Sequence, residues 1–187
     1  MSDVSDILVR SLLQESIPTV AVPMQANKVF IAVPHYKGEI RIELSKFLQV
    51  QTLRGELNHH PFYEGRPWDA ARNLIVKDFL ETRIGYNFLL MIDTDVIPPF
   101  NVLDLANFQY DIISPVCFSF QEGAPFALCL REVPGGYQQI NPIPANTLVE
   151  VYACGTGSIM FHRRVLEDIE HPWFSFEYDL FGILAKG

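Results

Sequence analysis

The chain has 187 residues, 49% hydrophobic and 19% charged, which is enough for one domain with a hydrophobic core and excludes a disordered chain. Its formal net charge of −8, with basic residues scattered along the sequence, argues against binding nucleic acid by charge. An acidic protein can still bind an anionic nucleotide when a divalent cation lies between them, so phosphorylated ligands stay open.

Residues 1–27 are expected to form a helical or irregular extension. Charged residues interrupt the apolar ones within residues 1–15, which is typical of a short amphipathic helix and not of a signal peptide. No apolar run approaches the roughly 20 residues that a membrane helix needs. We therefore expect a cytoplasmic protein without a transmembrane segment, and homo-oligomerisation stays open.

Residues 28–187 are expected to form a single domain that begins with an apolar strand at residues 29–34. A continuous apolar run of this length is typical of a strand buried on both faces of a parallel sheet. Apolar residues at helical spacing predict a helix over residues 39–53. A polar loop containing His59 and His60 follows.

A second helix and strand lead to a pair of carboxylates. The helix is predicted from Pro67 to about residue 80, with Gly85 after its end. Residues 87–92 form a fully apolar strand that runs directly into Asp93-Thr94-Asp95. The two carboxylates are therefore expected at the carboxyl end of a buried strand.

The rest of the chain is predicted to contain shorter elements. We expect a short helix, a strand, a hairpin turn, a strand, a small-residue turn, a further strand and a last helix that ends before Pro172. The alternation of strands and helices predicts an α/β protein with a mixed, mostly parallel sheet flanked by helices. The helices are expected at residues 101–107 and 163–170, the strands at 110–116, 149–153 and 159–161, the hairpin turn at 134–136 and the small-residue turn at 154–158.

The cysteines and histidines do not have the spacing of a zinc site. An odd number of cysteines inside apolar runs indicates reduced core residues. His35 directly follows a core strand and is a candidate ligand contact, whereas His162 is expected at a helix start. The cysteines are Cys117, Cys129 and Cys154.

Asp93 and Asp95 form a candidate site for a hard divalent cation. Ligands of open α/β sheets bind at the carboxyl ends of the strands. Mg²⁺ or Mn²⁺ takes one or two carboxylates and completes its coordination with phosphate oxygens and water. The alternative interpretation is a solvated turn that happens to contain two acids.

Four features, in this order, resemble the GT-A glycosyltransferases, particularly the family 2-like group. They are the strand at residues 29–34, the Ala-Arg-Asn sequence at residues 71–73, the strand ending in Asp93 and Asp95, and the Gly-Thr-Gly turn at residues 155–157. The resemblance covers residues 28 to about 178. It implies a GT-A type fold with a Rossmann-like, mostly parallel sheet, and a metal-dependent, inverting transfer of a sugar to an unknown acceptor hydroxyl.

The resemblance also implies a UDP- or GDP-sugar donor, with Mn²⁺ or Mg²⁺ as cofactor. Asp93 and Asp95 would hold the metal-bound diphosphate, Arg72 would lie near the base or diphosphate, and residues 34–36 would lie against the base and ribose. The candidate substrate-binding residues are Pro34, His35, Tyr36, Arg72, Asn73, Asp93, Gly157 and Trp173.

Several of these candidates have a structural alternative. Arg72 could instead form an ion pair with Asp69 or Asp78, and Asn73 could be satisfied within local packing. Trp173 belongs to an aromatic tail that is either core or a platform on which an acceptor sugar stacks.

The acceptor-side base is expected in the same tail. In inverting members of the resembled family a carboxylate after the Gly-rich turn acts as general base, often within an adjacent Glu-Asp pair. Here Glu177 and Asp179, separated by one residue, are the candidates. The alternatives are a base in a missing C-terminal extension or a chain without transferase activity.

Two other classes of function stay open. A non-catalytic nucleotide- or carbohydrate-binding module would need no base. A phosphatase of the haloacid dehalogenase type also has Asp-x-Asp after an apolar strand and uses the first Asp as nucleophile. That motif normally ends the first core strand, whereas some ninety residues precede Asp93 here, which argues against the phosphatase.

Overall fold

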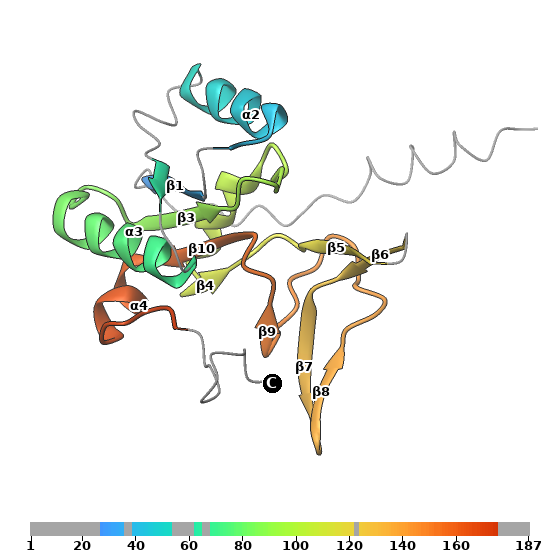
Figure 1. Ribbon diagram of the computed structural model, residues 1–187. Coiled ribbons are helices and arrows are strands. Elements are labelled where there is room, and N and C mark those ends of the chain that lie inside the picture. The colour runs from blue at the N-terminus through green and yellow to red at the C-terminus, as the bar shows by residue number, and fades with distance from the viewer. Residues whose placement is uncertain (1–26, 36–38, 54–61, 65–67, 122–123, 176–187) are drawn as a thin grey trace, which may run out of the picture.

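The centre of the protein is a five-stranded sheet with strand order β2-β1-β3-β10-β4 (Figure 1). Strands β2, β1, β3 and β4 point the same way, and β10 runs antiparallel between β3 and β4. The computed structural model describes residues 27–35, 39–53, 62–64, 68–121 and 124–175. The sheet strands are β1 (Val29–His35), β2 (Phe62–Glu64), β3 (Phe88–Ile92), β4 (Ile112–Ile113) and β10 (Ser158–His162).

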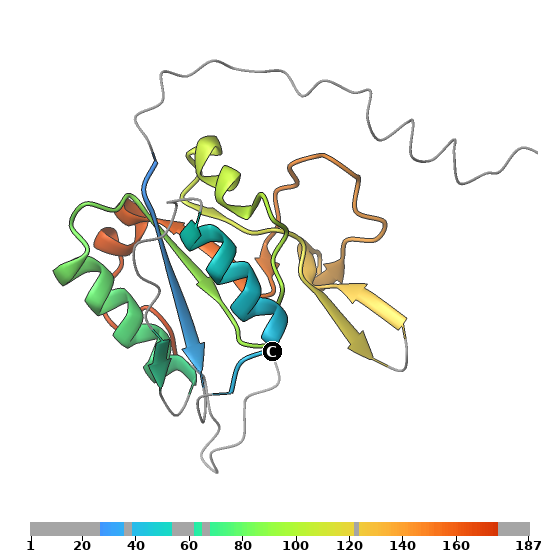
Figure 2. The same cartoon turned by 90° about the horizontal axis from the view of Figure 1, so that it is seen from above.

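Helices cover both faces of this sheet and make two hydrophobic cores. Because side chains alternate along a strand, Ile31 and Leu90 lie in one core while their neighbours Phe30 and Leu89 lie in the other. The first core is closed by α2 and the 3₁₀ helix η1, and the second by α3 and α4. Figure 1 shows α2 on one side of the strands with α3 and α4 on the other, and Figure 2 shows α2 running along the face of the sheet. The helices are α2 (Ile42–Leu53), α3 (Trp68–Thr82), η1 (Val102–Phe108) and α4 (Arg163–Asp168).

Two small antiparallel sheets lie beside the main one, between β4 and β10 in the sequence. One pairs β5 with β6, and the other has the order β8-β7-β9. The β7–β8 hairpin projects away from the main sheet (Figure 1). Its turn contains Gly135 at φ 91° and Gly136 at φ 154°, conformations that favour glycine. The strands are β5 (Phe118–Gln121), β6 (Ala124–Ala127), β7 (Cys129–Val133), β8 (Gly136–Gln139) and β9 (Ala153–Cys154).

Most predicted elements are present, including the mixed sheet and the hairpin turn. The predicted loop before Pro67 contains β2, which is three residues long and too short to show an apolar period. The strand expected at residues 110–116 is only two residues long. It lies at the sheet edge, where Pro115 has no N–H to donate.

Two further expectations on secondary structure were wrong in extent. Of the strand predicted at residues 149–153, only the end is paired, through β9 and a bond from the Tyr152 N–H to the Leu130 carbonyl at 2.8 Å. The helix predicted from residue 39 begins at Ile42. The amphipathic helix predicted at residues 1–15 lies outside the described residues. All three cysteines are free, and Cys129 is buried.

Within the described ranges, no helix is both long and apolar enough to cross a membrane.

Arg163 joins α4 to the end of α3. Its guanidinium donates hydrogen bonds to the carbonyl oxygens of Tyr86 at 2.8 Å, Phe79 at 2.9 Å and Arg83 at 2.7 Å. It also lies 4.2 Å from the centroid of the Phe79 ring. These carbonyls lie at and beyond the C-terminal end of α3, and those of Phe79 and Arg83 also accept backbone hydrogen bonds, from the Arg83 N–H at 3.2 Å and the Tyr86 N–H at 3.0 Å. The planar guanidinium thus bonds to three carbonyls at once.

We expect Arg163→Lys to lower the free energy of unfolding by about 1–3 kcal/mol, because an ammonium cannot replace three diverging hydrogen bonds. Urea denaturation measures this change. Arg164→Lys is the matched control, since its exposed ion pair with Asp111 should contribute less than about 1 kcal/mol. Equal effects of the two substitutions would contradict the role given to Arg163.

Candidate functional site

The candidate site lies at the carboxyl edge of the main sheet, where β3 ends and β10 begins. The Asp93 N–H donates to the Gly157 carbonyl at 2.8 Å, which extends the β3–β10 ladder by one bond. The Val96 N–H donates to the Asp93 carbonyl at 3.1 Å, and the Arg41 N–H donates to the Thr94 carbonyl at 3.2 Å. Three backbone bonds therefore fix the Asp93-to-Val96 turn against β10 and the start of α2.

A partly buried ion pair joins this turn to α3. Arg72 Nη2 lies 2.7 Å from Asp93 Oδ1 and 3.0 Å from Asp93 Oδ2, and it donates to Thr156 Oγ1 at 3.3 Å. The Arg72 side chain is 9% exposed and that of Asp93 is 24% exposed. One guanidinium thus connects α3, the end of β3 and the turn before β10.

The alternative partners of Arg72 are engaged elsewhere. Asp78 pairs with Arg83 and accepts hydrogen bonds from Tyr63 and Thr82. Asp69 accepts from the Ala70 N–H at the start of α3. The prediction that Arg72 faces the same sheet edge as the two aspartates agrees with this geometry.

Burial makes the charged form of Asp93 costly. Loss of water raises the pKa of this carboxyl above its ordinary value of 3.8, Arg72 lowers it and the nearby Asp95 raises it, and the net direction is upward. Arg72 carries a cost as well, because its Nε–H is buried without a hydrogen-bond partner among the described residues. A buried ion pair of this kind contributes little net stability.

The two predicted metal ligands lie close enough to interact electrostatically. Asp95 is exposed beside Asp93. In the described part of the chain, no group of three or more His, Cys, Asp or Glu side chains could hold a metal. Two carboxylates suit Mg²⁺ or Mn²⁺ only when phosphate oxygens and water supply the other ligands.

Gly157 brings β10 close to the aspartate turn. A Cβ on this glycine would lie 2.8 Å from Val96 Cγ2, which is closer than carbon atoms pack. Its neighbour Thr156 is exposed and contacts Arg72. Sequence reasoning noted the Gly-Thr-Gly turn but gave no role to the threonine, although its hydroxyl was the available signal.

Asn73 and Trp173 are held by structural contacts. The Asn73 side-chain amide donates to the Phe174 carbonyl at 2.8 Å and accepts from the Phe174 N–H at 3.1 Å. Trp173 Nε1 donates to the Leu166 carbonyl at 2.9 Å, and its ring packs against the core between α3 and α4. These bonds attach Trp173 to α4 and Phe174 to α3. Glu177 and Asp179 lie outside the described residues.

The β1 candidates lie at the same end of the sheet. Pro34 is buried and His35 is half-buried, and they pair in register with Tyr63 and Glu64 of β2. Tyr36 lies outside the described residues. His162, expected at a helix start, accepts a hydrogen bond from the Arg164 N–H and caps α4.

The fold and site define an α/β protein with a mixed sheet and a pair of aspartates at its carboxyl edge. Among solved structures, the chain is similar to A197 from STIV, with a TM-score of 0.54 and 19% identity over 83% of this chain and 73% of that one. This likeness shows a shared fold.

A second structure is that of a glycosyltransferase involved in the glycosylation of the major capsid of PBCV-1. It gives a TM-score of 0.37 and 17% identity over 80% of this chain and 71% of that one, and a likeness at this level carries no argument about activity. No family model and no curated protein match the sequence.

We expect the pKa of Asp93 in the metal-free protein to move in opposite directions in two variants. Asp95→Asn should lower it by removing a like charge, and Arg72→Met should raise it by removing the opposite charge. Carboxyl-carbon NMR titration in EDTA measures both, with Asp95→Glu as the charge-preserving control. A lower pKa in Arg72→Met would contradict the assigned pairing.

The raised pKa of Asp93 in the parent chain sets the sign of its effect on the pH dependence of stability. Because the pKa of Asp93 is higher in the folded than in the unfolded chain, its contribution to the free energy of unfolding is fully present below the unfolded pKa. That contribution is lost as the pH rises through the folded pKa.

Proposed function

We propose that this protein is a metal-dependent glycosyltransferase that moves a sugar from a UDP- or GDP-sugar to an acceptor hydroxyl with inversion. The observation that carries the proposal is the partly buried Arg72–Asp93 pair at the carboxyl edge of the sheet, with Asp95 exposed beside it. Ligands of open α/β sheets bind at this edge. The order of the sequence features that resemble GT-A glycosyltransferases supports the same function.

Asp93 and Asp95 are the residues that would hold Mn²⁺ or Mg²⁺. When bound, the cation would offset negative charge on the departing diphosphate. The protein contributes a fixed frame, because three backbone hydrogen bonds hold the aspartate turn and Arg72 orients Asp93 through both carboxylate oxygens. This preorganisation lowers the cost of ordering the site on binding.

Neighbouring residues at the same sheet edge would position the donor. In the sheet, β3, which leads into Asp93, lies between β1 and β10. His35 ends β1, and the exposed Thr156 precedes β10. We assign His35 to the base and ribose side of the donor and Thr156 to its diphosphate side. Gly157 keeps the space beside the turn free of a side chain.

The transfer step requires a base on the acceptor side. The acceptor oxygen forms a bond to the anomeric carbon as the bond from that carbon to the diphosphate breaks, and the electron pair leaves with the diphosphate. The hydroxyl proton passes to a carboxylate, for which we propose Glu177 or Asp179. Support comes from Asn73, which fixes the chain at Phe174, three residues before Glu177.

The geometry gives less support to a phosphatase. The phosphatase motif normally ends the first core strand, whereas here strands β1 and β2 precede β3, which leads into Asp93. A non-catalytic binding module would share the donor site and is separated from the transferase by the assays below.

We expect binding of UDP or GDP to depend on a divalent cation, because two carboxylates would otherwise face the diphosphate as like charges. Calorimetry with Mn²⁺, and then with EDTA, measures the difference. Equal affinity under the two conditions would rule out the metal bridge.

Asp95→Asn is the matched variant for this measurement. It should weaken nucleotide binding in Mn²⁺ by about 1–3 kcal/mol through loss of a charge-assisted contact. Its melting temperature should stay near that of the parent chain, because Asp95 is exposed. A large loss of thermal stability without ligand would instead assign Asp95 to the fold.

We also expect one of Glu177→Gln and Asp179→Asn to reduce sugar transfer by about 10²-fold or more while donor binding is unchanged, since general-base catalysis typically contributes that much. A transfer assay over a panel of nucleotide sugars, with calorimetry as the control, measures both effects. Near-normal transfer by both variants would show that neither residue is the base.

A further inference from the structure

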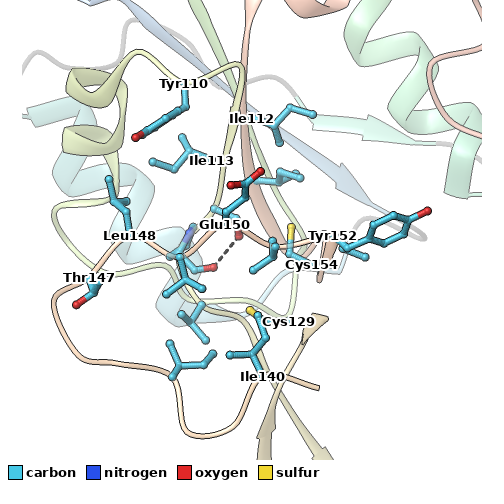
Figure 3. A pocket seen from close by; sticks show the side chains of 18 residues that line it. Tyr110, Ile112, Ile113, Cys129, Ile140, Thr147, Leu148, Glu150, Tyr152 and Cys154 are labelled. Carbon is cyan, nitrogen blue, oxygen red and sulfur yellow. Dashed lines mark hydrogen bonds between the residues drawn. The ribbon is translucent and has the colours of Figure 1, made fainter. Parts of the chain in front are cut away.

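A cavity of about 650 Å³ lies between the β4 edge of the main sheet and the segment that leads into β9 (Figure 3). Its volume is in the range of sites that enclose a small ligand. Apolar side chains form most of the wall, among them Ile113 and Ile159 from the main sheet and Ile140 and Val151 from the covering segment.

Large apolar side chains also surround the opening. Tyr110 is 53% exposed, Ile112 49%, Leu148 48% and Tyr152 58%. Single exposed apolar residues are ordinary, but several around one cavity mark a binding surface. This lining therefore favours a ligand with an apolar body.

In the part of the chain that the structure describes, the lining of the cavity offers no cationic side chain to a nucleotide diphosphate. The described residues that line it include one acidic side chain, Glu150, and no Lys, Arg or His. Glu150 is exposed and lies among the apolar side chains (Figure 3). A carboxylate repels a diphosphate but accepts hydrogen bonds from sugar hydroxyls.

The cavity and the candidate site are neighbours along the chain. Cys154 lies in its wall, and two residues later Thr156 accepts a hydrogen bond from Arg72. Two residues of extended chain span at most about 7 Å. Gly155 is held between these points by a bond from its N–H to the Leu128 carbonyl at 2.9 Å.

We propose that this cavity binds the apolar part of the acceptor, so that the acceptor is an uncharged amphiphile with a sugar head on an alkyl or aryl group. The inference rests on the proposed transferase function. The apolar group fills the cavity beside β4, and the hydroxyls of the sugar head lie near Glu150. The reacting hydroxyl is directed toward Thr156 and the Arg72–Asp93 pair.

The test compares octyl β-D-glucoside, below its micellar concentration, with methyl β-D-glucoside by calorimetry on the full chain. The octyl compound should bind at least about tenfold more tightly, because only its chain buries apolar surface. Val151→Trp, which fills the cavity, should lower the affinity for octyl glucoside at least tenfold. Val133→Trp in the β7–β8 hairpin, outside this cavity, should not. If Val151→Trp does not fold, the exposed rim variant Leu148→Glu should give the same loss.

Octyl sulfate tests the charge of the cavity with the same alkyl chain. We expect it to bind less tightly than octyl glucoside and to gain affinity in Glu150→Gln, because that substitution removes the repelling charge. Octyl sulfate binding as tightly as octyl glucoside to the parent chain would contradict an acceptor site for uncharged ligands.

Nucleotide binding separates failure of this inference from failure of the proposed function. UDP or GDP with Mn²⁺ should bind together with octyl glucoside, and competition between them would overturn a separate acceptor site. Nucleotide binding without any preference for the octyl chain would overturn the cavity assignment and leave the transferase proposal standing. Octyl glucoside binding without nucleotide binding would overturn the acceptor role.

A second copy of the chain is the other possible occupant that the experiment must detect. Sedimentation velocity of the parent chain and of Val151→Trp measures the oligomeric state. A dimer that Val151→Trp dissociates, together with no binding of octyl glucoside, would make this face a subunit interface and overturn the proposal.

Discussion

The Arg72–Asp93 ion pair is the interaction on which the candidate site depends. It joins α3, the end of β3 and, through Thr156, the turn before β10. The pair is partly buried, since the Arg72 side chain is 9% exposed and that of Asp93 is 24% exposed. The close approach of Gly157 to Val96 and the backbone bonds of the aspartate turn hold the Asp93 end of the pair in place.

This arrangement gives the two aspartates different properties. Asp93 is withdrawn from water and orients toward Arg72, whereas Asp95 stays exposed. One positive charge against two negative charges leaves the edge with a net negative charge, which suits a divalent cation bridging to an anionic ligand better than direct anion binding. The main effect of the pair is therefore on the net charge of this edge, and its contribution to the stability of the fold is small.

The small sheets add a second chemical environment beside this polar edge. Strand β9 separates the large cavity from an apolar hollow of about 300 Å³ near Leu128, and Cys154 lines both. Gly155 makes this close packing feasible, since a Cβ there would lie 2.9 Å from Leu128 Cδ1. The apolar cavity at Cys154 and the polar edge at Thr156 are therefore two residues apart along the chain.

The sequence by itself determined the buried strands, the main helices, the hairpin turn and the position of the carboxylates, because apolar runs, helical spacing and glycine turns are local properties. It did not determine β2, the short extent of β4 or the absence of a strand over residues 149–151, since pairing depends on neighbours distant in the chain. The sequence suggested Asp69 or Asp78 as an ion-pair partner of Arg72 and did not indicate Asp93, because residue type and spacing do not show which carboxylate lies nearest. Only the tertiary structure selected Asp93, by pairing β3 with β10 and packing α3 across them, and only it enclosed the cavity, whose walls come from segments up to 49 residues apart between Tyr110 and Ile159.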